Sequence, residues 1–309
     1  MINTNKKKEI SNMDARKLNP TELLKNYGFW MAIILSALVA INLTIFYKMD
    51  NIAHAGMSGL FWMAIYSLLW DRKQELKFQS QMLPTILGIL LIGWTLFVSK
   101  SIPTEKENNL LSVAPFVFSV GLSFIAAGFY GLKQFRWELL IIFFLGVPRV
   151  ILQSLLDLSP LTAKVSAFFL HYLGFNLVLD GIFIHLEKGS VKVYEGCSGI
   201  ESVTYVLGLS VICLVMFPIK KKDQYIVPLV AIVTGFMVNA FRVVLMAILV
   251  GRGEKEAFLY WHEGEGSLIF GMIAVIIFGL FYWLLMNKTQ KVATVSSYQE
   301  NDFFNSDQF

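Results

Sequence analysis

Apolar runs long enough to cross a lipid bilayer recur along almost the whole chain. A helix of roughly 18 apolar residues or more matches the ~30 Å of hydrocarbon in a membrane. Of the 309 residues, 56% are hydrophobic and 16% are charged, whereas a soluble globular protein carries about a quarter charged residues. The sequence therefore predicts an all-α polytopic membrane protein and excludes a soluble globule.

About eight transmembrane helices are expected from these runs. They cover residues 28–47, 56–70, 83–99, 110–131, 137–155, 198–217, 225–249 and 265–286. Four regions follow from this reading, namely a polar cytoplasmic tail (1–27), N-terminal transmembrane helices (28–136), a membrane core (137–288) and a disordered cytoplasmic tail (289–309). The first apolar run is about 20 residues long, longer than the core of a cleaved signal, so we expect no cleaved signal peptide.

Positive charge predicts the orientation of the spans. Most of the 26 Lys and Arg lie in five segments, which are 6–25, 72–77, 133–136, 220–222 and 288–291. Because cytoplasmic segments carry such an excess, we expect a multi-pass protein of the cytoplasmic (inner) membrane with both termini inside. The net charge of +4 therefore reflects Lys and Arg placed in the cytoplasmic segments. We expect the lipid bilayer as a partner and no nucleic acid.

This orientation places residues 156–197 on the outer side. "SPLTAKVSAFFLHYLGF" (159–175) has the apolar spacing of a short interfacial or re-entrant helix. "GIFIHLEKGSVKVY" (181–194) alternates like a short hairpin with "EKG" as its turn. We therefore expect an amphipathic segment and a hairpin before the sixth span.

One cysteine lies at the outer end of that span, in "VYEGCSGIES" (193–202). Small Ser198 and Gly199 after Cys197 would let a substrate approach closely, and a helix N-terminus favours a thiolate. Cys197 is thus a candidate nucleophile, with a small packing residue as the alternative. Cys213 follows 16 helical positions later, about 24 Å away, too far for a disulfide, so both are expected to be free.

An arginine lies inside the seventh span. Arg242 costs several kcal/mol there unless it is paired or hydrated, which marks it as functional by default. The alternative is a side chain that extends to the outer head groups. Asn239 lies on the same helical face and can hold Arg242 or a substrate carbonyl, or bond to a neighbouring helix.

A histidine follows in the outer loop "YWHEGEG" (260–266). His262 can act as general acid or base, because imidazole titrates near neutrality. His54, His171 and His185 are also expected on the outer side, so any of the four can face the thiol.

Acidic residues flank both candidate groups. Glu201 can orient the histidine or the arginine, although a helix-start carboxylate satisfied by the helix dipole is favoured. Glu195 precedes the cysteine, and Glu263 and Glu265 are expected to form a solvated rim or to meet basic residues of a partner. The sequence contains neither a Gly-rich phosphate loop nor a His/Cys cluster with metal-ligand spacing, so we expect no cofactor and no metal.

Together these elements resemble the exosortase/archaeosortase family. The resemblance rests on Cys-Ser-Gly at 197–199, Asn239-x-x-Arg242 and His262, with Pro148 and "GSVKVYEGCSG" upstream, and it covers about residues 137–286. It marks 137–288 as an exosortase-like catalytic core, while the first four spans resemble the family only as hydrophobic packing.

The resemblance implies a cysteine protease-transpeptidase at the outer face of the membrane. Such an enzyme cleaves a C-terminal sorting tail (PEP-CTERM-like) of secreted proteins through a Cys thioacyl intermediate and passes them to an unknown surface acceptor. It implies Cys197 as nucleophile, His262 as proton-transfer group and Arg242 as stabiliser of the oxyanion or thiolate. Ser198, Gly199, Asn239, Glu201 and Glu195 are expected to support the site or to bind substrate.

Two other classes of function stay open from the residues alone. The first is a membrane transporter or channel in which Arg242 binds an anionic solute. Its polar residues should then lie near the midplane of paired repeats, whereas here they gather at one face. The second is a scaffold protein whose cysteine is incidental.

Overall fold

Membrane-length helices dominate the computed structural model, which describes residues 26–49, 51–101, 109–262 and 266–306. Within these residues, seven helices are long and apolar enough to cross a membrane. They are α3 (Tyr27–Lys48), α4 (Ile52–Asp71), α5 (Met82–Ser101), α6 (Asn109–Ala127), α8 (Arg136–Leu155), α11 (Ile226–Arg252) and α13 (Gly266–Ser306). A shorter apolar helix of 17 residues, α10 (Ile200–Met216), corresponds to the sixth expected span. The all-α polytopic fold is confirmed.

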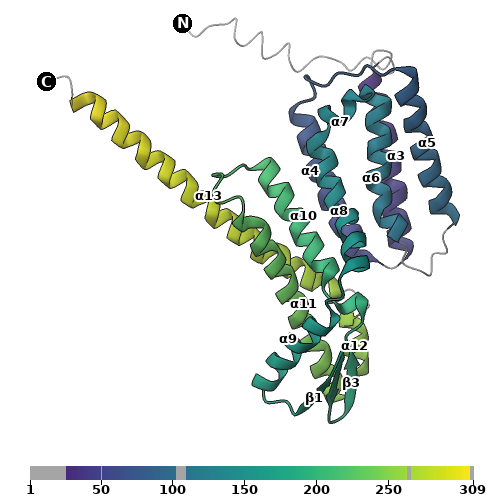
Figure 1. Ribbon diagram of the computed structural model, residues 1–309, viewed down its shortest axis with the longest axis vertical. Coiled ribbons are helices and arrows are strands. Elements are labelled where there is room, and N and C mark those ends of the chain that lie inside the picture. The colour runs from purple at the N-terminus through teal and green to yellow at the C-terminus, as the bar shows by residue number, and fades with distance from the viewer. Residues whose placement is uncertain (1–25, 50, 102–108, 263–265, 307–309) are drawn as a thin grey trace, which may run out of the picture.

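The helices pack as a series of neighbours. α3, α4, α5, α6 and α8 form one bundle, with the short helix α7 (Tyr130–Gln134) at one end (Figure 1). α8 packs against α6 and also against α10, which packs against α11, and α11 packs against α13. Because α8 contacts both groups of helices, it links the N-terminal bundle to the C-terminal helices.

α10 and α11 cross at close range because α11 has a glycine at the contact. A Cβ atom on Gly235 would lie only 2.7 Å from the carbonyl oxygen of Ser202 in α10. Small residues let helix backbones approach in this way in membrane proteins. The approach brings the start of α10 next to the next turn of α11, where Asn239 lies.

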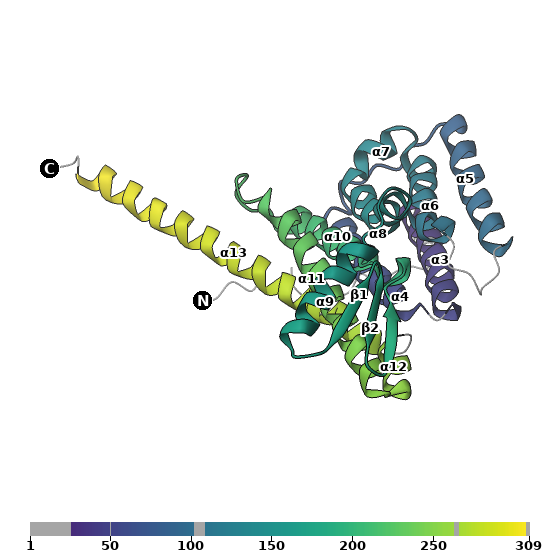
Figure 2. The ribbon, with the colours of Figure 1, turned by 60° about the horizontal axis from the view of Figure 1, so that its bottom comes forward.

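A small mixed unit gathers at the end of the molecule opposite to α7 (Figures 1 and 2). It contains α9 (Ser159–Tyr172), the strands β1 (Leu177–Asp180), β2 (Phe183–Leu186) and β3 (Gly189–Lys192), and α12 (Lys255–His262). The strands form an antiparallel sheet in the order β1-β2-β3. The expected helix and hairpin are both present, and the hairpin turn is at Glu187–Lys188.

The first strand, β1, was not expected from the sequence. Asp180 pairs with Phe183, so Gly181 and Ile182 form the two-residue connection, and Gly181 has a φ of 58°. Glycine at the first position of a two-residue connection suits a hairpin turn with positive φ there, so Gly181 was the available clue. The inward face of the sheet packs with α9 and α11 in one hydrophobic cluster that includes Cys197.

The second span extends into the residues on either side of 56–70, because α4 runs from Ile52 to Asp71. The C-terminal end of the chain differs from expectation. α13 continues as a helix to Ser306, where a disordered tail from 289 was expected. No glycine or proline follows Gly279 in the chain, so no residue interrupts the helix. The expected N-terminal cytoplasmic tail (1–27) lies almost wholly outside the described residues.

Candidate active site

Cys197 lies in a tight turn between the sheet and α10. Glu195–Cys197 form one turn of 3-10 helix, η1, in which the Cys197 N–H donates to the carbonyl of Tyr194 at 2.8 Å. The residue is 9% exposed. Cys197 and Cys213 are both free thiols, which confirms the absence of a disulfide expected from their spacing.

Gly199 shapes this turn for two physical reasons. Its φ of 93° lies in the left-handed region, which glycine adopts without steric cost. A Cβ atom at this position would also lie 2.8 Å from Nδ2 of Asn239. The glycine therefore both allows the turn and leaves room for the asparagine behind it.

Two buried donors hold consecutive carbonyls of the turn. Asn239 Nδ2 donates to the carbonyl of Cys197 at 2.9 Å, and Thr162 Oγ1 donates to the carbonyl of Ser198 at 2.7 Å. Neither residue is more than 3% exposed. The observed bond of Asn239 thus reaches the main chain of the cysteine rather than Arg242, and α11 and α9 both hold the turn in place.

His262, at the end of α12, lies against the thiol. Its Nε2 is 3.6 Å from Cys197 Sγ, a hydrogen-bonding distance for sulfur, and 3.4 Å from the Tyr194 hydroxyl. Phe258 stacks on the imidazole with ring centroids 5.1 Å apart. Tyr194 was not expected at the site, and its place three residues before the cysteine was the only sequence signal.

The other three histidines lie elsewhere. His54 is fully buried in α4, with Nδ1 at hydrogen-bonding distance from the Tyr205 hydroxyl. His185 pairs with Ser190 across the hairpin, and His171 is exposed at the end of α9. Orientation alone left the four histidines open, the family resemblance pointed to His262, and the structure places His262 beside the thiol.

Arg242 joins the same group from α11. Its Nη2 donates to the main-chain carbonyl of His262 at 2.8 Å, which ties the end of α12 to α11. Its buried Nε has no hydrogen-bond partner in the described part of the chain. The guanidinium therefore brings a fixed positive charge to the region of the thiol and keeps a donor available there.

Burial and the neighbouring groups act in opposite directions on the Cys197 thiol. Burial raises the pKa of Cys197 above its ordinary value, and the Arg242 cation and a hydrogen bond with Tyr194 oppose this shift without cancelling it. The expectation that the helix N-terminus favours a thiolate is thus outweighed by burial. Because a thiolate is the nucleophile, a base must take the proton, and Nε2 of His262 is at a distance that permits this transfer.

Glu201 is half-buried and makes its polar contacts with residues other than the thiol and the imidazole. Arg149 Nη1 donates to its carboxylate at 2.8 Å and the Tyr205 hydroxyl donates to it at 2.7 Å. In the described residues an ion pair, not the helix dipole alone, satisfies this carboxylate, and the expected roles of orienting the histidine or the arginine are not observed. Arg149 was missed by the sequence analysis, although an arginine inside the span 137–155 carried the same signal as Arg242.

Of the other acidic residues named from the sequence, the structure describes Glu195 alone. Glu195 is exposed, and its carbonyl accepts from the Ser198 N–H at 3.1 Å. Glu263 and Glu265 lie outside the described residues. Within the described ranges, no group of three or more His, Cys, Asp or Glu side chains is placed to hold a metal ion.

Comparison with known proteins gives two matches and one negative result. The family described as "Transmembrane exosortase (Exosortase_EpsH)" matches residues 48–279. This match begins further upstream than the resemblance expected from the sequence, which covered residues 137–286. A curated protein of Methanocaldococcus jannaschii named "Probable archaeosortase E" is 30% identical over 98 residues, which is 31% of this chain and 50% of that protein. The chain thus matches about half the length of this relative. No solved structure matches.

Proposed function

This chain belongs to the transmembrane exosortase family, and from that premise we propose that it is a membrane-embedded cysteine peptidase or transpeptidase acting on the C-terminal sorting tails of secreted proteins. The observation that carries the proposal is the 3.6 Å approach of Cys197 Sγ to His262 Nε2, between segments 65 residues apart. A thiol and an imidazole in contact form the nucleophile–base pair of covalent acyl transfer.

The first chemical step uses this pair directly. Nε2 of His262 takes the proton of the Cys197 thiol as sulfur attacks the carbonyl carbon of the scissile peptide bond. The carbon–nitrogen bond then breaks, and the leaving amine receives that proton from the imidazolium. The product is a thioester between Cys197 and the acyl part of the substrate. An acceptor amine or water completes the reaction, which gives transfer or hydrolysis respectively.

Arg242 is proposed to stabilise negative charge during this step. Its Nε is buried and has no hydrogen-bond partner in the described residues, and its positive charge lowers the pKa of Cys197 against the effect of burial. A fixed cation in a poorly hydrated site stabilises a developing thiolate or oxyanion far more than it would in water. The same side chain holds the main chain of His262, so it also positions the base.

The transporter hypothesis has less support. A transporter for an anionic solute would use Arg242 alone, and it would leave the contact between Cys197 Sγ and His262 Nε2 unexplained. A scaffold without catalysis would leave the thiol–imidazole contact without a purpose.

We further propose that the site opens to the outer face of the cytoplasmic membrane, with both termini inside. The support is the placement of the site and of the basic loop 220–222 at opposite ends of α10. The partners would be the sorting tail, the surrounding lipid and a surface acceptor. A membrane-impermeant thiol reagent should label Cys197 in intact cells.

The experiment compares Cys197→Ala with Cys213→Ala. Full-length protein and a tail-bearing secreted substrate are produced together, and the mass of the released substrate is measured. Cys213→Ala should process normally, because its thiol lies three turns or more along α10. Cys197→Ala should leave the tail uncut, and hydroxylamine should release a hydroxamate of the substrate from the unaltered enzyme. Normal processing by Cys197→Ala would end the proposal.

A further inference from the structure

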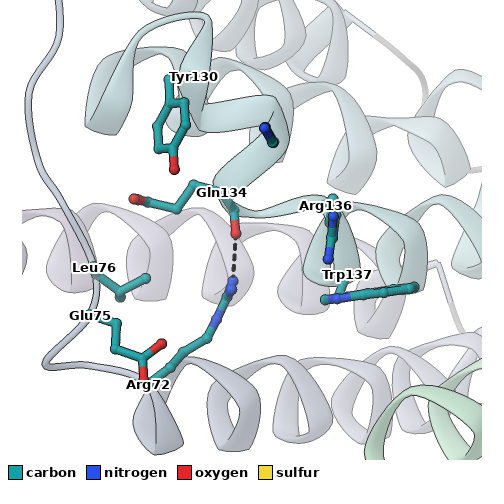
Figure 3. A pocket seen from close by; sticks show the side chains of 8 residues that line it. Arg72, Glu75, Leu76, Tyr130, Gln134, Arg136 and Trp137 are labelled. Atoms are coloured by element: carbon teal, nitrogen blue, oxygen red, sulfur yellow. Dashed lines mark hydrogen bonds between the residues drawn. The ribbon is translucent and has the colours of Figure 1, made fainter.

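A second candidate binding site lies at the end of the molecule opposite to Cys197. A cavity of about 280 Å³ is lined by Arg72, Glu75, Leu76, Tyr130, Lys133, Gln134, Arg136 and Trp137 (Figure 3). These residues come from the end of α4 and the loop after it, from α7 and from the start of α8. The cavity is distant from Cys197, because α8 runs from this end of the bundle toward the sheet (Figure 1).

The walls of this cavity are held by a fixed set of bonds. Arg72 Nη2 donates to the Gln134 carbonyl at 2.8 Å and to the Glu138 carboxylate at 2.6 Å. The Lys77 N–H donates to Gln134 Oε1, and Gln134 Nε2 donates to the Lys77 carbonyl, both at 3.1 Å. The loop after α4 is thereby fastened to α7, so the cavity exists before any ligand arrives.

The charge of the walls is positive. Glu138 already neutralises Arg72. Lys133 and Arg136 are exposed and line the cavity together with Glu75, and the Arg136 guanidinium lies over the Trp137 ring. The chemistry therefore suits an anion with several oxygen acceptors.

The setting of the cavity suits a lipid. Tyr130 and Trp137 are 57% and 43% exposed at its rim, and Tyr and Trp concentrate at the head-group level of membranes. Basic pockets beside membrane helices bind anionic head groups. The volume is at the lower limit for a ligand pocket, which fits a head group better than a larger solute.

We propose that this cavity binds the phosphate of an anionic phospholipid head group in the leaflet at the α7 end. Lys133 and Arg136 bind the phosphate oxygens, and Tyr130 and Trp137 contact the glycerol and upper acyl region. The proposal does not depend on the reaction at Cys197.

The test measures binding of short-chain phosphatidylglycerol to the full-length protein in neutral detergent, by calorimetric titration. Each cation near an anionic head group strengthens binding about fivefold. The double variant K133Q/R136Q should therefore bind about 25-fold more weakly. The matched control K221Q/K222Q removes the same charge from the loop after α10 and should bind as the parent does. Equal weakening of both variants would show unspecific attraction and overturn the proposal.

Two further arms identify the ligand. Inorganic phosphate and short-chain phosphatidylcholine should each compete poorly with phosphatidylglycerol. Equal competition by free phosphate would refute a lipid site, and equal binding of phosphatidylcholine would refute selection for an anion. Glu75→Gln should strengthen binding of phosphatidylglycerol, because it removes the one repelling carboxylate from the lining. Weaker binding of that variant would contradict the assigned chemistry.

Discussion

Asn239→Ala should both destabilise the protein and displace the candidate nucleophile. Asn239 is 3% exposed, and its Nδ2 donates to the Cys197 carbonyl at 2.9 Å. Removing the donor leaves a buried carbonyl unsatisfied, which costs about 1–3 kcal/mol in the free energy of unfolding. At about 2 °C for each kcal/mol, Tm should fall by about 2–6 °C.

The same change should lower catalysis more than stability alone explains. A shift of the Cys197 turn by about 1 Å can reduce the rate about 100-fold. Thermal unfolding in detergent and kcat/KM for tail cleavage measure the two effects. Ser166→Ala is the control, because Ser166 Oγ also makes a buried bond to α11, at 3.1 Å to the Ala240 carbonyl, without touching the turn. It should lower Tm by a few degrees and leave kcat/KM nearly unchanged. If both variants lost activity equally, or Asn239→Ala kept full activity and stability, the positioning argument would fail.

Three further changes test the site. Arg242→Gln should raise the pKa of Cys197, because the cation that opposes burial is lost, so the pH profile of iodoacetamide alkylation should move to higher pH. A move to lower pH would contradict this reasoning. His262→Ala should lower kcat/KM for tail cleavage by about 10²–10⁴, while His185→Ala should change it by less than about twofold; equal losses would remove His262 from its proposed role. Gly199→Ala should lower Tm by a few degrees, because a left-handed φ of 93° costs an alanine about 1–2 kcal/mol. An unchanged Tm would show that the turn can relax.

The sequence by itself determined the membrane class, the approximate positions of the spans and the candidate residues of the site. These follow from local properties. Bilayer thickness sets the length of an apolar helix, and an arginine inside such a helix is costly enough to indicate a functional role. The resemblance carried by Cys197, Asn239, Arg242 and His262 predicted the family, which the match over residues 48–279 confirms. The catalytic roles of these residues stay predictions.

Only the tertiary structure decided which partners these residues meet. By expected orientation alone, any of four histidines could face the thiol, and the packing of α12 against α11 places His262 there. The Glu201 carboxylate forms an ion pair with Arg149 and no hydrogen bond with His262 or Arg242 in the described residues. The reason is physical: which side chains meet depends on the rotation and separation of helices that are distant in the chain. A contact such as that between Gly235 and Ser202 sets that geometry. The hydropathy pattern of a sequence does not predict such a contact.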